Sequence, residues 1–176
     1  MIDAFNEMVH GWQNFYFMVG GAAAALMGLM FVALSLGSHL VERTTQEQIG
    51  AFVTPSILYF VSVLLLACIM LIPTFSPLGL AVLLAAGAAI GLQRTVFHVR
   101  ALVRTALKVG DFDRWDWLSG IIFPPLSYAL VLIAAVLLLL NVWSVALLDL
   151  WLVVILLFVC AISNTWALVL WIVDQR

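Results

Sequence analysis

The chain is dominated by long stretches that contain no charged residue. Runs free of Asp, Glu, Lys and Arg extend over residues 8–41, 48–93, 117–148 and 150–173. A helix that crosses a hydrocarbon core of roughly 30 Å needs about 20 apolar residues, and each run reaches that length. Hydrophobic residues make up 66% of the sequence and charged residues 9%, far below the ~25% of a soluble domain. The sequence therefore predicts an integral membrane protein.

The run over residues 48–93 is long enough for two passes, and so is the stretch 117–173, which Asp149 alone interrupts. The sequence Ile72-Pro73-Thr74-Phe75-Ser76-Pro77 supplies turn chemistry, because each proline removes a backbone donor. A second break is expected at Asn141-Val142-Trp143-Ser144, since one straight helix from 117 to 173 would greatly exceed the bilayer. We predict an all-α polytopic membrane protein with a single transmembrane domain over residues 1–176. Its five spans are placed at about 12–38, 50–72, 77–97, 117–140 and 146–172.

The distribution of basic residues predicts how these helices are oriented. All seven Lys and Arg residues fall in the segments 39–50 and 94–115 or at the C-terminal Arg176. An odd number of spans puts these three regions on one side of the membrane. Short loops rich in Lys and Arg stay in the cytoplasm during insertion. The prediction is an N-terminus outside and a C-terminus in the cytoplasm.

Two helices carry stripes of small residues. In the first helix the stripe is Gly20, Ala24 and Gly28, and in the third it is Gly87 and Gly91. Such spacing lets helix backbones approach closely where lipid gives little hydrophobic drive for association. The stripes are consistent with contact between helices one and three inside one subunit. A subunit interface that makes a homo-oligomer is the alternative, and the two surfaces could also serve different contacts.

The strongest polar feature follows the third span. Helix three is expected to continue to about residue 109 in the cytoplasm, and Gly110 is a credible stop. At ~100° per residue Arg94, His98, Arg104 and Lys108 share one face. This basic stripe can set topology and contact anionic lipid headgroups. Alternatively, several copies of it would line a cytoplasmic vestibule that favours anions.

A few polar residues within the spans are candidates for the lining of a conduction path. Pro124 and Pro125 free the carbonyl groups of Gly120 and Ile121 from helical hydrogen bonds, and free carbonyls at membrane depth need donors, water or ions. Ser119 and Ser127 lie nearby in sequence. Asn164 should point into the helix bundle, where hydrogen bonding between helices is the usual role. The possible polar lining is therefore Ser119, Pro124, Ser127 and Asn164.

Several functional classes are set aside. No lysine lies within a span, which excludes a retinal Schiff base. No acidic residue is placed at mid-depth, where ion-coupled transporters usually keep one. Protease signatures such as HExxH are absent from the sequence, as is a soluble domain that would bind nucleotide or nucleic acid. We expect no enzymatic activity, no catalytic or metal site and no cofactor.

A short resemblance adds a cellular setting. The segment Gly11-Trp12-Gln13-Asn14-Phe15-Tyr16, followed by residues 20–36, resembles the first helix of small bacterial multi-pass membrane proteins of unassigned function. Some of these carry a label as modulators of a membrane protease. The resemblance implies the bacterial inner membrane.

Two functions remain open from the sequence. The first is a homo-oligomeric channel or pore for small ions, suggested by the small-residue faces and the proline-broken helices. The basic cytoplasmic stripe would give such a pore a preference for anions. The second is a non-conducting accessory or regulatory subunit of a larger membrane complex, such as a membrane protease, held by the same small-residue faces.

Overall fold

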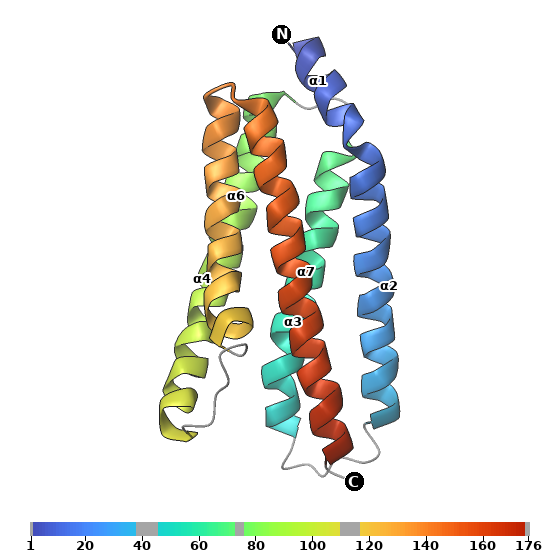
Figure 1. Ribbon diagram of the computed structural model, residues 1–176, viewed down its shortest axis with the longest axis vertical. Helices are drawn as coiled ribbons and strands as arrows, with labels where there is room; N and C mark the ends of the chain where they lie inside the picture. The colour runs from blue at the N-terminus through green and yellow to red at the C-terminus, as the bar shows by residue number, and fades with distance from the viewer. Residues whose placement is uncertain (1, 38–45, 73–75, 110–116, 175–176) are drawn as a thin grey trace.

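The chain folds as an all-α helical bundle in the computed structural model, which describes residues 2–37, 46–72, 76–109 and 117–174. Every regular element in this part of the chain is a helix. Figure 1 shows the long helices running side by side along one axis. The elements are α1 (Ile2–Gly11), α2 (Gln13–Gly37), α3 (Gln46–Met70), α4 (Pro77–Val109), the π-helix η3 (Leu118–Ile122), α6 (Phe123–Leu139) and α7 (Trp143–Asp174).

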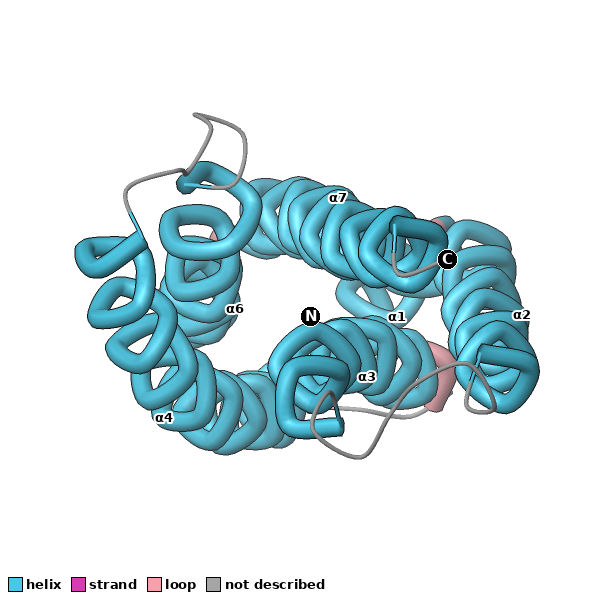
Figure 2. The backbone as a smooth tube through the Cα atoms, turned by 90° about the horizontal axis from the view of Figure 1, so that it is seen from below, coloured by secondary structure: helices cyan, strands magenta, loops and turns pink. Residues whose placement is uncertain are grey.

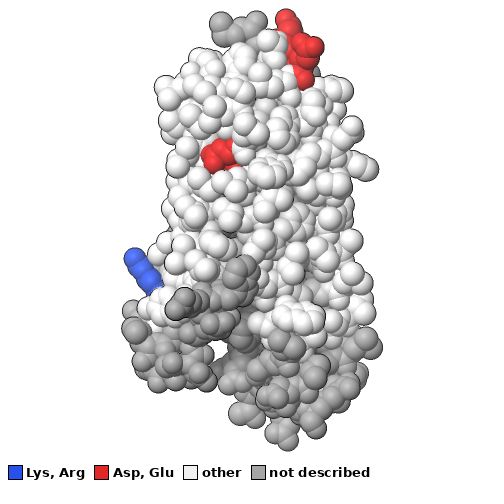
Figure 3. Space-filling view, viewed as in Figure 1, with Lys and Arg blue, Asp and Glu red and all other residues white. Residues whose placement is uncertain are grey.

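Five helical segments within the described residues are long and apolar enough to cross a membrane. They are Gln13–Ser35, Val53–Met70, Pro77–Arg100, Leu118–Leu139 and Trp143–Ala167. Large apolar side chains cover the outside of the bundle, among them Phe17, Leu29 and Trp166. Figure 3 shows this surface as almost entirely uncharged, with acidic side chains toward the end that carries α1. The chain is therefore a multi-pass membrane protein by length, composition and surface.

The helices form a flattened bundle rather than a round one (Figure 2). The main contacts join α2 to α3, α3 to α7, α7 to α6 and α6 to α4. The expected pairing of the first and third spans is therefore wrong. Helices α2 and α4 lie at opposite ends of the cross-section. Gly20 of α2 packs against α3, and Gly91 of α4 packs against α6. Sequence spacing marks a packing face without naming its partner.

Local capping residues explain where two of the turns fall. The Ser76 hydroxyl accepts a hydrogen bond from the Gly79 amide at 3.1 Å, and Pro77 occupies the first helical position, so α4 begins with a favourable cap. At the end of α6, Asn141 adopts a positive φ of 60°. The Val142 amide bonds to the Leu137 carbonyl at 2.9 Å and the Asn141 amide to the Leu138 carbonyl at 3.2 Å. This pair of bonds is a Schellman motif, which ends the helix.

The first ten described residues form a separate short helix where the sequence analysis placed only a tail. Helix α1 is amphipathic, with Phe5 fully buried and Asp3, Glu7 and His10 exposed. The Phe5 ring meets the Trp143 ring edge to face, with centroids 5.4 Å apart. One aromatic contact thus ties α1 to the start of α7. The arrangement is typical of a helix that lies at a membrane interface.

Candidate functional site

The double proline produces a local change of helix type at the start of α6. Proline has no amide hydrogen, so Pro124 and Pro125 cannot donate the bonds that an α-helix would place there. The Phe123 amide instead donates to the Leu118 carbonyl, five residues back. Residues 118–122 consequently wind as a π-helix, a feature often found at functional sites. The sequence predicted free carbonyl groups at Gly120 and Ile121. The backbone accommodates the missing proline amides by the wider turn of the π-helix.

The residues expected to line a conduction path here are enclosed by the chain itself. Ser119 and Ser127 are buried, as is Pro124. The Ser127 hydroxyl donates to the Phe123 carbonyl at 2.8 Å, so it satisfies its own helix rather than the carbonyls of Gly120 and Ile121. These side chains do not lie on a surface that a second subunit could share. An intersubunit pore would need to be lined by other residues.

A hydroxyl pair connects α3 to α6 in the middle of the bundle. The oxygens of Ser62 and Tyr128 are 2.7 Å apart. The Ser62 hydroxyl also contacts the Leu58 carbonyl at 2.8 Å, and because a carbonyl can only accept, Ser62 is the donor there. A hydroxyl has one hydrogen, so Tyr128 donates to Ser62. The pair fixes α6 relative to α3 by a hydrogen bond between side chains that are far apart in sequence.

Gly91 gives Tyr128 the space that it occupies. Gly91 is buried on α4, and a Cβ built on it would overlap the Tyr128 ring, lying 2.7 Å from Cζ. Thr95, one turn further along α4, is buried as well. The packing role expected of Gly91 therefore exists, with a tyrosine of α6 as the partner.

A narrow crevice separates α3 from α4 beside this hydroxyl pair. Its volume is about 90 Å³, and both Ser62 and Tyr128 line it, together with apolar side chains such as Leu66, Leu84 and Val153. Helices α3 and α4 are consecutive in the chain yet make few contacts with one another. Gly87 also lines the crevice and has no atom within 4 Å of a built Cβ. This second glycine of the α4 stripe is thus free of the contacts that hold Gly91.

The small-residue stripe of α2 is divided in the same way. Gly20 is buried, and a Cβ on it would lie 2.9 Å from the Ala67 Cβ of α3. Ala24 and Gly28 are exposed, and Gly28 has nothing within 4 Å of a built Cβ. Gly21 is exposed and equally open. The chain therefore uses one end of the stripe to pack α2 on α3 and leaves the rest uncovered.

The basic stripe is only partly described. Arg94 is exposed and His98 is half-buried on α4. Arg104 and Lys108 belong to the same helix, but their side chains lie outside the described part of the structure. The shared basic face therefore stays a prediction beyond Arg94 and His98. Gly110, expected to end the helix, also lies outside the described residues.

Polar residues on α7 are arranged at two depths. Asn164 is half-buried, and its neighbour Thr165 donates to the Ala161 carbonyl at 2.8 Å. Near the other end of the bundle, Trp143 Nε1 and one carboxylate oxygen of Asp149 are buried without a hydrogen-bond partner among the described residues, and so is the hydroxyl of Tyr16 on α2. An ionisable residue within a span is a candidate functional residue, which singles out Asp149.

Comparison with protein-family models, with curated proteins and with solved structures finds no match. The resemblance of residues 11–36 to small bacterial membrane proteins therefore stays a prediction. Within the described residues, no three side chains of the types that bind metals lie close enough to hold an ion. The functional argument thus depends on the surfaces and cavities of this chain alone.

Two features of the structure are absent from the predictions made from the sequence. Phe5, Val9 and Trp12 recur at intervals of four and three residues, a helical period that could have revealed α1. Ser62 had no comparable signal, because a single serine in an apolar run does not show which helix it faces. Its partnership with Tyr128 depends on tertiary packing.

Proposed function

We propose that this chain is a non-conducting accessory protein that binds a transmembrane helix of a larger membrane complex through α2. The observation that carries the proposal is the uncovered part of the small-residue stripe. Ala24 and Gly28 of the stripe are exposed on α2, and so is Gly21 beside them. Helix α2 lies at one edge of the flattened bundle (Figure 2). In lipid, helices associate where small residues permit close backbone contact. An edge helix with such a face is accessible to a partner without rearrangement of the bundle.

The mid-depth surface supports this function better than a channel. In the middle of the described spans the exposed side chains are apolar or small, for example Ala24, Leu65, Ile90, Ile133 and Ile155. A pore formed between copies of this chain would present such residues to its axis. Rings of polar or charged groups usually select ions. The hydroxyl groups expected to supply them face the interior of one chain.

Site-specific photocrosslinking tests the proposed contact in living cells. A photoreactive side chain replaces Ala24 on the α2 face. The matched control replaces Ile133, an exposed residue of α6. We expect an adduct with a different membrane protein from position 24 and little from position 133. Gly28→Leu should abolish the adduct because a bulky side chain separates the backbones, whereas Gly87→Leu on α4 should leave it.

Other outcomes would count against the accessory function. An adduct at position 24 that contains two copies of this chain would favour self-association instead. A closed ring in mild detergent, together with a conductance that reverses at a different potential for Arg94→Gln under a chloride gradient, would support an anion-preferring channel. Equal labelling from positions 24 and 133 would show that α2 has no preferred partner.

The proposal includes the membrane and the orientation. We place the protein in a bacterial inner membrane with its N-terminus outside and its C-terminus in the cytoplasm. The distribution of all seven Lys and Arg residues supports this orientation through the positive-inside rule.

A further inference from the structure

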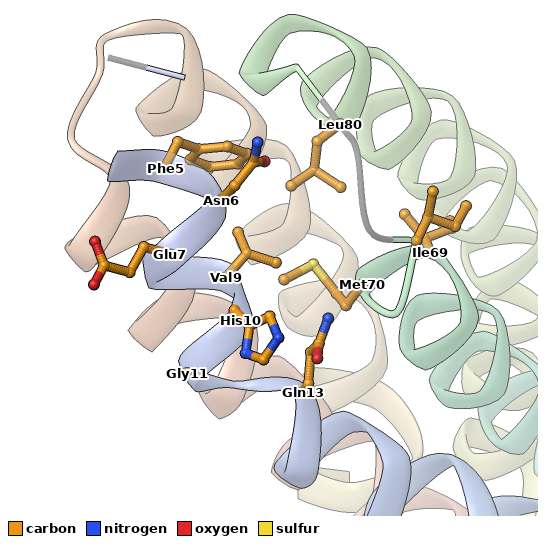
Figure 4. Close-up of a pocket in the computed structure, with 11 residues that line it drawn as sticks. Phe5, Asn6, Glu7, Val9, His10, Gly11, Gln13, Ile69, Met70 and Leu80 are labelled. Carbon is orange, nitrogen blue, oxygen red and sulfur yellow. The ribbon is translucent and has the colours of Figure 1, made fainter. Parts of the chain in front are cut away.

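A cavity of about 530 Å³ lies at the end of the bundle that carries α1. It is a partly open pocket lined by α1, the first residue of α2, the end of α3 and the start of α4 (Figure 4). Pockets that bind small molecules usually measure roughly 300–1,000 Å³ and combine apolar walls with a few polar groups. This cavity therefore has the size of a ligand site. It shares Ile69 with the α3–α4 crevice, whereas the exposed α2 face formed by Gly21, Ala24 and Gly28 contributes none of its lining residues.

The cavity has two chemically different walls. Phe5 and Val9 of α1 face Met70 and Leu80, which are both about 1% exposed, and together they make an apolar wall. The side chains of Asn6, His10 and Gln13 also line the cavity and turn toward it in Figure 4. Amide and imidazole groups both donate and accept hydrogen bonds. The walls therefore suit an amphiphile with an apolar part and a polar head.

The position of the cavity along the bundle indicates that such an amphiphile is a lipid of the surrounding membrane. The candidate spans Gln13–Ser35, Val53–Met70 and Pro77–Arg100 each have one end beside the cavity. The cavity thus lies at the level where hydrocarbon gives way to headgroups. The amphipathic helix α1 that covers it is of the kind that rests in this interfacial layer. A lipid of the membrane itself has its headgroup at this level.

Charge narrows the choice of headgroup. Helix α1 carries Asp3 and Glu7, and the Glu7 carboxylate is at the edge of the cavity, directed away from its centre (Figure 4). Among the cavity's lining residues none is Lys or Arg. The described basic side chains, Arg94 and Arg100, belong to the second half of α4. A carboxylate at the edge of a cavity without a basic group among its described lining residues favours a cationic group over an anionic one.

We propose that this cavity binds the headgroup end of a membrane phospholipid whose head carries an ammonium group. The ammonium lies toward the Glu7 side, the amides of Asn6 and Gln13 hydrogen-bond the polar head, and the first part of an acyl chain contacts Val9, Met70 and Leu80. The site is separate from the α2 face, so it does not depend on the accessory function.

Native mass spectrometry of the full chain in detergent tests the site with two probes. Phosphatidylethanolamine and phosphatidylglycerol with identical acyl chains are titrated in turn. We expect phosphatidylethanolamine to bind more tightly by roughly two- to fivefold, the range of one exposed charge pair. Val9→Trp fills the cavity and should weaken binding roughly tenfold or more. Met8→Trp, on an exposed neighbour that does not line the cavity, is the matched control and should leave binding unchanged.

Two conservative variants keep the test informative if Val9→Trp does not fold. Asn6→Leu removes hydrogen-bonding groups at similar volume and should weaken both lipids. Glu7→Gln should abolish the preference for phosphatidylethanolamine, whereas Asp3→Asn, on an exposed residue outside the lining, should preserve it. The proposal is overturned if phosphatidylglycerol binds equally or better, or if Asn6→Leu and Glu7→Gln both match wild type. Equal retention of lipid by Val9→Trp and Met8→Trp, with both variants folded, would also overturn it.

Discussion

Gly91 and Gly87 occupy successive turns of α4, and the structure gives them opposite environments. A Cβ on Gly91 would overlap the Tyr128 ring, whereas nothing lies within 4 Å of a Cβ on Gly87. We expect Gly91→Ala to lower the free energy of unfolding by about 1–3 kcal/mol, the usual cost of overpacking. Gly87→Ala should leave it unchanged or slightly raised, because alanine favours helix more than glycine does. Thermal unfolding in detergent, followed by tryptophan fluorescence, measures both.

A double variant shows whether Tyr128 is the cause. Combining Gly91→Ala with Tyr128→Leu removes the ring that the new methyl group would meet. The combined loss should be smaller than the sum of the single losses, since the two residues are in direct contact. Strictly additive losses would mean that Gly91 is needed for another reason.

The hydrogen bond between Ser62 and Tyr128 allows a second test at the scale of single residues. Tyr128→Phe keeps the ring and removes the donor, and Ser62→Ala removes the acceptor. Side-chain hydrogen bonds between membrane helices contribute about 0.6 kcal/mol on average. We expect a coupling free energy of that order from the double-mutant cycle, measured by unfolding in detergent. A coupling of zero would show that the 2.7 Å contact does not stabilise the bundle.

At the scale of elements, the sequence predicted where the spans lie much better than it predicted which helices pack against one another. Helix number follows from charge-free length, and the start of α4 follows from Ser76 and Pro77, so both are local properties. Contacts are not local: Gly20 meets Ala67 and Gly91 meets Tyr128, and no spacing rule selects those partners. The same reason explains why the environment of the candidate site residues was not predicted. Ser119 and Ser127 were recognised as polar, but their burial in the core depends on how α6 is turned.

Helix α1 is attached to the bundle chiefly by one aromatic side chain, which gives a prediction about an element. Phe5 is fully buried and contacts Trp143. Phe5→Ala should release α1 while leaving the five long helices folded, because α1 contributes few of the bundle's contacts. We expect faster hydrogen exchange in the peptide covering residues 2–12. Met8→Ala, on the exposed side of α1, is the control.

Hydrogen exchange in Phe5→Ala also distinguishes two roles of Phe5: holding α1 against the bundle, and supporting the start of α7. If exchange increases in α1 alone, Phe5 anchors an interfacial helix. If exchange increases throughout α7 as well, the Phe5–Trp143 contact supports the start of that span. The second result would contradict the view of α1 as a peripheral element.

For the whole molecule, the length of the apolar segments indicates how many helices can cross the membrane, whereas the placement of charged residues indicates in which direction they cross it. Apolar length establishes that five helices can cross a membrane, and it is insensitive to direction. Direction is carried by Lys and Arg, because these residues resist translocation when they lie in short loops next to a span. The acidic groups have little influence on direction. In the proposed orientation the N-terminal segment therefore crosses the membrane despite Asp3 and Glu7, while the basic segments remain in the cytoplasm.

This orientation predicts the behaviour of fusions at both ends and the effect of moving charge. A C-terminal fluorescent protein should be bright and a C-terminal alkaline phosphatase inactive, because the C-terminus is expected in the cytoplasm. Introducing Lys at positions 3 and 7 in place of the acidic residues should reduce the fraction of correctly inserted chains, since basic residues next to the first span oppose its translocation. Asp3→Asn with Glu7→Gln is the matched control and should insert normally. An active C-terminal phosphatase in the unaltered chain would show that the bundle is inserted the other way, and the cavity beneath α1 would then lie at the cytoplasmic interface.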